Sequence, residues 1–379
     1  MEQKMNYDEF KESVKDTIKH FLPEKYEDAD VSIKQVVKNN DTMLDAITIK
    51  SNESNLTPTI YLNKFYEAYQ DGQDMMDILA DIAKIHMDHA VDFDVNISSI
   101  VDFDNVQDKI ICKLVNMEAN EKLLSDRPFT QVEDLAVTYH ILIDKVADET
   151  ATIPINNSLM KMFDVPLEEL HNIALENTER LLPVTITPMS EVISEMKIQE
   201  LLSFERMSEE EAREIIEGVM QMTGDCPLYV VSNDSKIDGA TAILYSDVLD
   251  QIAEKLGEDF YVLPSSIHEA LVISKSDAGS REEMQAMVQE VNANEVKPGE
   301  ILSNYVYEYD SQAHELFRAD KAEERQAKKE KEMELPKEQQ KEEKRERVSL
   351  KEKLPEMKEK AAKVNVAKDV VDKTKEACI

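Results

Sequence analysis

A short polar turn offers the clearest set of reactive groups in this sequence. It runs Pro264-Ser-Ser-Ile-His-Glu269 and brings hydroxyl, imidazole and carboxylate groups together. These groups can perform nucleophilic or general acid–base chemistry, so one hypothesis is a small hydrolase that uses His268 with Ser266. Alternation along an extended chain places Ser266 and His268 on one side and Glu269 on the other. In the alternative interpretation, the serine and histidine side chains bind the turn backbone and Glu269 is solvated.

Cys226 is a second candidate nucleophile. It precedes Pro227 and an apolar run that predicts a strand, and a thiolate paired with His268 would suit a hydrolase. This pairing requires the fold to bring the two side chains together. A buried cysteine without such a partner is more often inert, and the sequence leaves the two interpretations open.

Two histidines about one helical turn apart could hold a metal ion. His86-Met-Asp-His89 places two imidazoles at positions i and i+3 of a predicted helix. The glutamate of the HExxH motif is missing, and the motif supplies no third ligand. Both histidines flank an apolar stripe that ends at Ile85, so the other interpretation places them at the edge of the core.

Sequence signatures of bound cofactors are absent. Neither GxxxxGK[ST] nor GxGxxG occurs, which disfavours P-loop NTPases and Rossmann dehydrogenases. Asp92-Phe-Asp-Val-Asn96 begins like a calcium loop, but Ile97 stands where that loop requires glycine and Phe103 where it requires glutamate. We therefore expect no cofactor.

The elements around these candidates predict an α+β fold with mostly antiparallel sheets. The apolar runs Phe260–Leu263 and Ala270–Ile273 flank the polar turn and are typical of paired strands. Leu228–Ser232 and Ala240–Tyr245 are predicted to be further strands. Asp74 is predicted to cap the helix that carries the two histidines.

Composition divides the chain into three parts. We predict an N-terminal α+β lobe over residues 1–187, a smaller α+β lobe over 188–317 and a tail over 318–379. The tail contains no glycine and no aromatic residue. Its composition, rich in lysine and glutamate, cannot bury enough apolar surface to offset its ordering entropy. We expect it to be disordered or transiently helical, with Ala319–Glu334 as its most helical segment.

Charge is distributed unevenly between these parts. The chain has a formal net charge of -35, and the tail, with 19 basic and 16 acidic residues, contributes +3. The remaining 25 basic and 63 acidic residues give residues 1–317 a net charge of -38. Such a body repels nucleic acid and anionic lipid headgroups and favours a protein partner with a basic surface. Neither a CxxC pair, a signal sequence nor a membrane span is evident, so we expect a cytoplasmic protein.

Several scattered motifs resemble one protein family. They are Tyr61-Leu-Asn-Lys-Phe-Tyr-Glu-Ala-Tyr69 with Gly72, Lys113-Leu-Val-Asn116 with Asn120, Asp134-Leu-Ala136, Asn177-Thr178 with Pro183, and Tyr261-Val-Leu-Pro-Ser-Ser-Ile-His-Glu269. Together, from about Tyr7 to Asp310, they are similar to a bacterial family catalogued as domain of unknown function 5688. The resemblance implies no activity, cofactor or catalytic residue. The tail, around Arg347-Val-Ser-Leu-Lys-Glu-Lys-Leu354, is similar to ends found on proteins of conjugative mobile elements.

These observations favour a non-enzymatic binding or accessory module, associated with mobile genetic elements. The acidic body motivates the search for a basic partner, and the tail would act as a flexible tether. The alternatives are a hydrolase that uses His268 with Ser266 or Cys226, and a metal-binding protein that uses His86 and His89.

Overall fold

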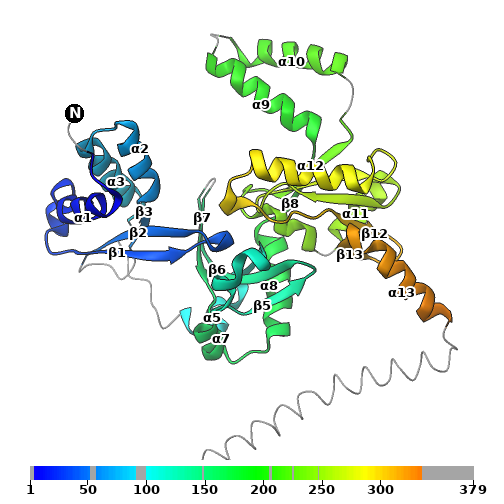
Figure 1. The fold of residues 1–379 in the computed structure, drawn as a ribbon, viewed down its shortest axis with the longest axis horizontal. Helices are drawn as coiled ribbons and strands as arrows, with labels where there is room; N and C mark the ends of the chain where they lie inside the picture. The colour runs from blue at the N-terminus through cyan, green and yellow to red at the C-terminus, as the bar shows by residue number, and fades with distance from the viewer. Residues whose placement is uncertain are drawn as a thin grey trace, which may run out of the picture. The chain divides into compact units, whose positions relative to one another are not determined.

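The computed structural model describes residues 4–51, 57–90, 100–146, 149–204, 207–223, 226–245 and 247–334 of the chain. Contacts group residues 1–319 into one unit and residues 320–379 into a second. The first unit contains the three sheets described below, whose strands and helices are drawn in Figure 1.

A three-stranded antiparallel sheet and three helices form the N-terminal part of the first unit. The strands, in spatial order, are β1 (Asp30–Val37), β2 (Met43–Lys50) and β3 (Thr59–Tyr61). The helices are α1 (Tyr7–Thr17), α2 (Asn63–Asp71) and α3 (Met75–His89). Apolar residues at helical spacing on α1 and α3 share one core with Ile47 of β2. Asp74 caps α3 by accepting a hydrogen bond from the Met76 N–H, which confirms the predicted cap.

The second sheet has a long central strand. Its strands are β4 (Ile110–Asn116), β5 (Phe129–Val132), β6 (Leu135–Val146) and β7 (Glu149–Pro154). Strand β6 pairs antiparallel with each of the other three. Strand alternation sends Val137 and Tyr139 into the core shared with α8 (Leu167–Leu181), and it sends Thr138 and His140 to the opposite face.

Six antiparallel strands form the third sheet, in the order β13-β12-β10-β11-β9-β8. They are β8 (Val184–Pro188), β9 (Leu228–Asn233), β10 (Phe260–Pro264), β11 (Ala270–Ser274), β12 (Tyr307–Asp310) and β13 (Glu315–Arg318). Helix α11 (Val248–Leu256) shares a hydrophobic cluster with Phe260 and Val262, and α12 (Arg281–Asn294) shares another with Tyr261 and Leu263. Because these residues alternate along β10, the two helices cover opposite faces of the sheet.

Shorter helices connect these layers. They are α5 (Phe103–Val106), α6 (Glu121–Leu124) and α7 (Asn157–Phe163). Between β8 and β9, α9 (Met189–Phe204) and α10 (Glu209–Thr223) form a helical hairpin (Figure 1). Short 3₁₀ helices include η3 (Asn39–Asp41), η5 (Glu118–Asn120), η6 (Gly239–Leu244) and η7 (Pro298–Glu300). The second unit contains α13 (Ala322–Glu334), in the segment predicted to be the most helical part of the tail.

The predicted α+β class with antiparallel sheets is confirmed, because every strand pairing of the described residues is antiparallel and helices accompany all three sheets. The lobe boundary near residue 187 stays a prediction. Strand β8 pairs with β9 across that boundary, and one hydrophobic cluster contains both Leu170 and Val231.

Two segments differ from their predicted structure. Ala240–Tyr245, predicted as a strand, lies largely in the 3₁₀ turn η6. Ala240 and Ala242 are fully buried, and an apolar run of this kind indicates burial without fixing its backbone conformation. Glu315–Arg318 forms strand β13 and Ala319 is 4% exposed, so Arg318 belongs to the third sheet and not to the tail.

Candidate functional site

The polar turn between β10 and β11 uses its side chains to stabilise itself. The Ser266 N–H donates to the Glu269 carbonyl over 3.1 Å, and the His268 N–H donates to Ser266 Oγ over 3.0 Å. The His268 ring accepts at Nδ1 from the Asp238 N–H, 3.2 Å away, and Glu269 accepts from the Ser265 hydroxyl. Within this described turn, no hydrogen bond joins the Ser266 hydroxyl to the His268 ring. The contacts are therefore those of a turn stabilised by its own polar groups.

Antiparallel register places Cys226 far from His268. Strand β9 pairs with β11 so that Leu228 lies opposite Ile273. Continuing the register two residues beyond this pair places Cys226 level with residue 275, which is 275 − 268 = 7 residues from His268. Strand β11, Ala270–Ser274, lies between these two positions and alone spans about 13 Å. The structure therefore does not bring the thiol and the imidazole together.

The two histidines of α3 lie in different surroundings. His86 is 1% exposed, lies edge-to-face with Tyr26 at 5.0 Å between ring centres, and has no hydrogen-bond partner for either ring nitrogen among the described residues. His89 is exposed, with Nδ1 2.9 Å from the Ile85 carbonyl oxygen. Within the described residues, no group of three or more histidine, cysteine or acidic side chains is arranged to hold a metal. Asp92–Asn96 lies outside the described residues.

Replacing His86 with leucine is expected to stabilise the fold, and to do so more strongly at acidic pH. The substitution removes two unpaired buried nitrogens, which is expected to add about 1 kcal/mol to the free energy of unfolding at pH 7.5. Burial, followed by the charge of Lys25, lowers the pKa of His86 below its usual value. As the pH falls below about 6.5, the unfolded wild-type chain binds a proton at His86 that the folded chain does not, so the wild type loses more stability than the variant. Urea unfolding at pH 7.5 and pH 5.5 measures both effects.

The matched control is His20→Leu, which replaces an exposed histidine and should change neither free energy by more than about 0.5 kcal/mol. A variant His86→Leu that is less stable than the wild type would contradict the interpretation, since it would reveal a favourable interaction of the ring. A stability difference that stays constant between the two pH values would contradict the pH dependence.

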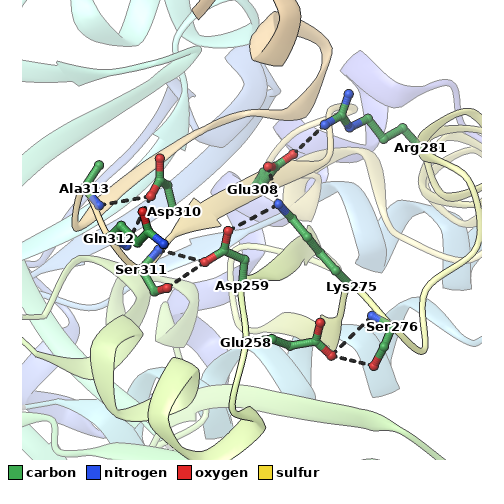
Figure 2. Close-up of polar contacts among 10 residues, drawn as sticks. All are labelled: Glu258, Asp259, Lys275, Ser276, Arg281, Glu308, Asp310, Ser311, Gln312 and Ala313. Atoms are coloured by element: carbon green, nitrogen blue, oxygen red, sulfur yellow. Dashed lines mark hydrogen bonds and ion pairs between the residues drawn. The ribbon is translucent and has the colours of Figure 1, made fainter. Parts of the chain in front are cut away.

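A polar cluster beside β10 and β12 contains four acidic residues and compensates much of its own charge (Figure 2). Glu308, 6% exposed, accepts hydrogen bonds from Lys275 Nζ at 2.6 Å and Arg281 Nη2 at 3.1 Å. Asp259 accepts from the N–H and the hydroxyl of Ser311 and lies 3.4 Å from Lys275 Nζ. These contacts join the start of α12 and the loop after β12 to the sheet, which is a structural role.

A cleft with a volume of about 1050 Å³ lies where the β1–β2 hairpin and α2 meet the second sheet and the loops around η6 and η7. Its basic residues are Lys38, Lys64, Lys113, Arg127 and Lys297, and its acidic residues are Asp238 and Glu300. Five basic minus two acidic residues gives +3, in a body whose net charge is -38. The cleft therefore gathers positive charge in a strongly acidic protein.

A buried histidine lies near three of these cations. His140 is 8% exposed, and its Nε2 lies 3.2 Å from Thr138 Oγ1. Its Nδ1 is buried and has no hydrogen-bond partner among the described residues. Burial, followed by the charges of Lys113, Arg127 and Lys38, lowers the pKa of His140 well below its usual value. We call Lys38, Lys113, Arg127 and His140 the cationic cluster.

The charge of the cationic cluster is only partly compensated. Lys113 Nζ lies 2.7 Å from Asp238 Oδ2, and both side chains are largely buried. The Arg127 guanidinium makes no hydrogen bond or ion pair with a described residue, and burial lowers its pKa although Asp126 acts in the opposite direction. Lys38 Nζ lies 4.6 Å from the centre of the Tyr61 ring. Among the described residues, Asp238 is thus the one carboxylate that forms an ion pair with any of these three cations.

Strand register brings the cationic cluster together. Lys113 of β4 lies opposite Thr138 of β6, and His140 follows on the same face of β6 two residues later. Strand β5 pairs with the same stretch of β6, so Arg127, two residues before β5, reaches the same region. Lys38 follows β1 at the tip of the hairpin. The four residues come from separate strands and turns, and tertiary pairing unites them.

The arrangement can bind an anion. Lysine and arginine form charge-assisted hydrogen bonds with phosphate or carboxylate oxygens, and a neutral imidazole can donate or accept one more. Asn39, also in the cleft wall, donates through Nδ2 to the Gly299 carbonyl over 2.8 Å, while its buried Oδ1 has no partner among the described residues. The cleft wall therefore also contains a buried acceptor whose hydrogen-bonding capacity is unused, and this atom suits a donor group of a ligand and not its anionic oxygens.

The sequence-predicted turn lies beside this cleft. Ile267 contributes to the cleft wall, and Asp238 contacts both His268, through its N–H, and Lys113, through its carboxylate. The cleft residues themselves were not predicted as a site. A usable signal was present, because Lys113 and His140 each interrupt a run of apolar residues that predicts a strand.

Comparison with known proteins identifies a family but no characterised relative. A family model described as a family of unknown function, DUF5688, matches residues 7–311, as the sequence motifs predict. No curated protein and no solved structure matches the chain. In the described part of the chain, no helix has the length and apolar composition that a membrane crossing requires.

Proposed function

We propose that this chain, which belongs to the family DUF5688, is a non-enzymatic binding module that takes a small anion in the cleft at the cationic cluster. One observation carries the proposal. Three cations and a neutral buried histidine converge on one cleft with a single ion-paired carboxylate among the described residues.

Burial explains why this grouping points to a ligand. Removing a charge or a polar atom from water costs free energy unless a partner compensates it. The Nδ1 atom of His140 has no such partner among the described residues, and burial lowers the pKa of the half-buried Arg127 guanidinium. An anion in the cleft would supply acceptors to Arg127 and Lys38 and a partner to His140, which would offset that cost.

The acidic exterior limits the size of the anion. A body with a net charge of -38 repels nucleic acid polymers and anionic membranes, whose charge extends well beyond the cleft. A small anion that enters the cleft escapes most of this repulsion, because the local charge there is +3. The exterior itself favours a protein partner with a basic surface, which we retain as part of the proposal.

Replacing Arg127 with alanine is expected to weaken anion binding about 10- to 100-fold, because a hydrogen bond to a charged group contributes about 1.5–3 kcal/mol. Thermal unfolding with inorganic phosphate, succinate, AMP and dodecyl phosphate as probes identifies the anions that raise the melting temperature. Isothermal titration calorimetry of the best probe then compares the wild type with Arg127→Ala.

Two further variants keep this experiment decisive. Lys38→Ala removes an exposed cluster cation with little risk to folding and is expected to weaken binding about 3- to 10-fold. Arg213→Ala removes an exposed arginine of α10 and should leave affinity unchanged. The proposal fails if none of the four probes binds, or if both cluster variants bind as tightly as the wild type.

A further inference from the structure

We propose that the anion carries an extended apolar chain, with its phosphate or carboxylate head group at the cationic cluster and its chain along β3, α2 and α3. This inference rests on the proposed anion-binding function and specifies the class of ligand. It follows from how the two kinds of lining residue are distributed over the elements of the fold.

The second sheet supplies the polar end of the cleft. Lys113, Thr138 and His140 lie on one face of β4 and β6, and Thr152 of β7 lines the same cleft. Arg127 adjoins this face from the turn before β5. This wall therefore supplies Lys113, Arg127 and His140 of the cationic cluster, and Lys38 adjoins them from the β1–β2 hairpin.

The N-terminal part supplies a mixed wall, whose apolar residues form what we call the apolar wall. Its lining side chains include Ile60 of β3, Phe65 and Ala68 of α2, and Ile85 of α3. Ile85 is 37% exposed at the end of the apolar stripe of α3. Lys64 and Gln73 also line this part of the cleft. Ile60 is 5% exposed, so Phe65, Ala68 and Ile85 offer most of the surface that an apolar chain would cover.

The size of the cleft argues against a bare inorganic anion. Pockets of about 300–1000 Å³ hold drug-sized molecules, and this cleft has a volume of about 1050 Å³. An inorganic anion bound at the cationic cluster would leave the apolar wall uncovered. A ligand with an attached chain would cover that wall, and each methylene buried there raises affinity about fourfold. A ligand that carries both groups uses both walls.

The aromatic content of the walls argues against a nucleotide. Stacking of a base requires an open ring face. The Tyr61 ring already has Lys38 Nζ 4.6 Å from its centre. Phe65 is the other aromatic side chain in the described lining, and it also packs against the N-terminal core. The walls therefore fit an aliphatic chain better than a base.

Calorimetry with a series of probes tests the inference. The probes are inorganic phosphate, butyl, octyl and dodecyl phosphate, dodecanoate, AMP and dodecyltrimethylammonium, each below its micelle concentration. We expect dodecyl phosphate to bind at least tenfold more tightly than butyl phosphate and inorganic phosphate. Dodecanoate should share this preference for a long chain, and comparison with dodecyl phosphate identifies the preferred head group. The cationic probe should not bind, since it has the chain without the anion.

Variants at the apolar wall and at the cationic cluster separate the contribution of the chain to affinity from that of the head group. Ile85→Glu places a carboxylate in the apolar wall. It should lower the affinity for dodecyl phosphate at least tenfold and change the affinity for inorganic phosphate less than twofold. Ile215→Glu, a matched change at an exposed isoleucine of α10, should change neither affinity. Arg127→Ala should weaken binding of both anions.

The outcomes distinguish the two proposals. Equal affinity for inorganic and dodecyl phosphate, or tighter binding of AMP, would overturn the apolar-chain inference and leave the anion-binding function standing. Binding of dodecyltrimethylammonium as tightly as dodecyl phosphate would overturn the assignment of the head group to the cationic cluster. Binding of none of the anions would overturn the proposed function, and the inference with it.

Discussion

Replacing Gly239 with alanine is expected to reduce the free energy of unfolding by about 3 kcal/mol or more, one of the two largest effects foreseen for this protein. A Cβ atom at this position would lie 2.1 Å from Ser232 Oγ, 2.5 Å from the His268 carbonyl oxygen and 2.8 Å from the Asn233 nitrogen. Two of these three atoms are backbone atoms, so a side-chain rotation cannot relieve the overlap. Urea unfolding of the wild type and Gly239→Ala measures the loss.

The crowding arises where three segments meet. The Ser232 hydroxyl of β9 donates to the His268 carbonyl over 2.8 Å, and the Ala240 N–H of η6 donates to the Ile267 carbonyl over 3.2 Å. Gly239 fits into this junction because it has no side chain. The residue before it, Asp238, forms the ion pair with Lys113, so displacement of η6 should also weaken binding of the anion.

Gly218→Ala is the control for this substitution. Gly218 lies inside α10, and an alanine Cβ there would meet nothing within 4 Å. Alanine is the better helix former, so this variant should gain about 0.5–1 kcal/mol. A loss below 1 kcal/mol for Gly239→Ala would contradict the close approach of the three segments.

Local sequence patterns were sufficient to predict the hairpin that carries the polar turn. Two apolar runs around a polar turn predict paired strands, and β10 and β11 pair antiparallel with Val262 opposite Val272. The signal is local, because the strands are adjacent in the chain and the turn between them is short. The cap of α3 at Asp74 was predictable for the same reason.

Prediction failed where tertiary contacts decide the conformation. The buried run of η6 has the hydrophobicity of a core strand, but its backbone forms a 3₁₀ turn whose Ala240 N–H bonds to the Ile267 carbonyl. Strand β13 is four residues long, and its pairing with β12 joins it to the third sheet. Neither contact has a signature in the local sequence.

The candidate site shows the same limit. The polar residues predicted as a site are adjacent in the chain, and they stabilise their own turn and join it to Asp238. The cationic cluster instead joins Lys38, Lys113, Arg127 and His140, which are single polar residues among apolar neighbours or at turns. Only the pairing of β4 and β5 with β6 brings three of them to one wall. A polar residue inside a predicted core strand was the signal to pursue.

Replacing Asn40 with alanine is expected to lower the free energy of unfolding by about 4 kcal/mol and to weaken binding in the cleft as well. Asn40, at the tip of the β1–β2 hairpin, donates through Nδ2 to the carbonyls of Pro298 and Ile301 at 2.7 and 2.8 Å. Its Oδ1 accepts from Asn120 Nδ2 at 3.0 Å, and its own N–H donates to Asn120 Oδ1 at 2.8 Å. The substitution removes three side-chain hydrogen bonds that contribute about 0.5–1.5 kcal/mol each.

Backbone conformation adds to this cost. Asn40 has a φ of 55°, in the left-handed region, where alanine is disfavoured by about 1–2 kcal/mol. Asn40→Gly removes the hydrogen bonds but relieves this strain, so it should be about 1 kcal/mol more stable than Asn40→Ala. Measuring both variants by urea unfolding separates the two contributions. Asn294→Ala, which removes one exposed contact within α12, should stay within about 0.5 kcal/mol of the wild type.

The hairpin tip links stability to the proposed ligand. Lys38 and Asn39 of the cleft wall immediately precede Asn40, and Asn39 is held by the Gly299 carbonyl in the same loop that binds Asn40. Release of the tip should therefore displace one cluster cation and widen the cleft, lowering affinity for dodecyl phosphate about tenfold in protein that remains folded. If Asn40→Ala lost stability but kept full affinity, the tip would serve folding alone, and the head-group site would depend on Lys113, Arg127 and His140 of the second sheet without it.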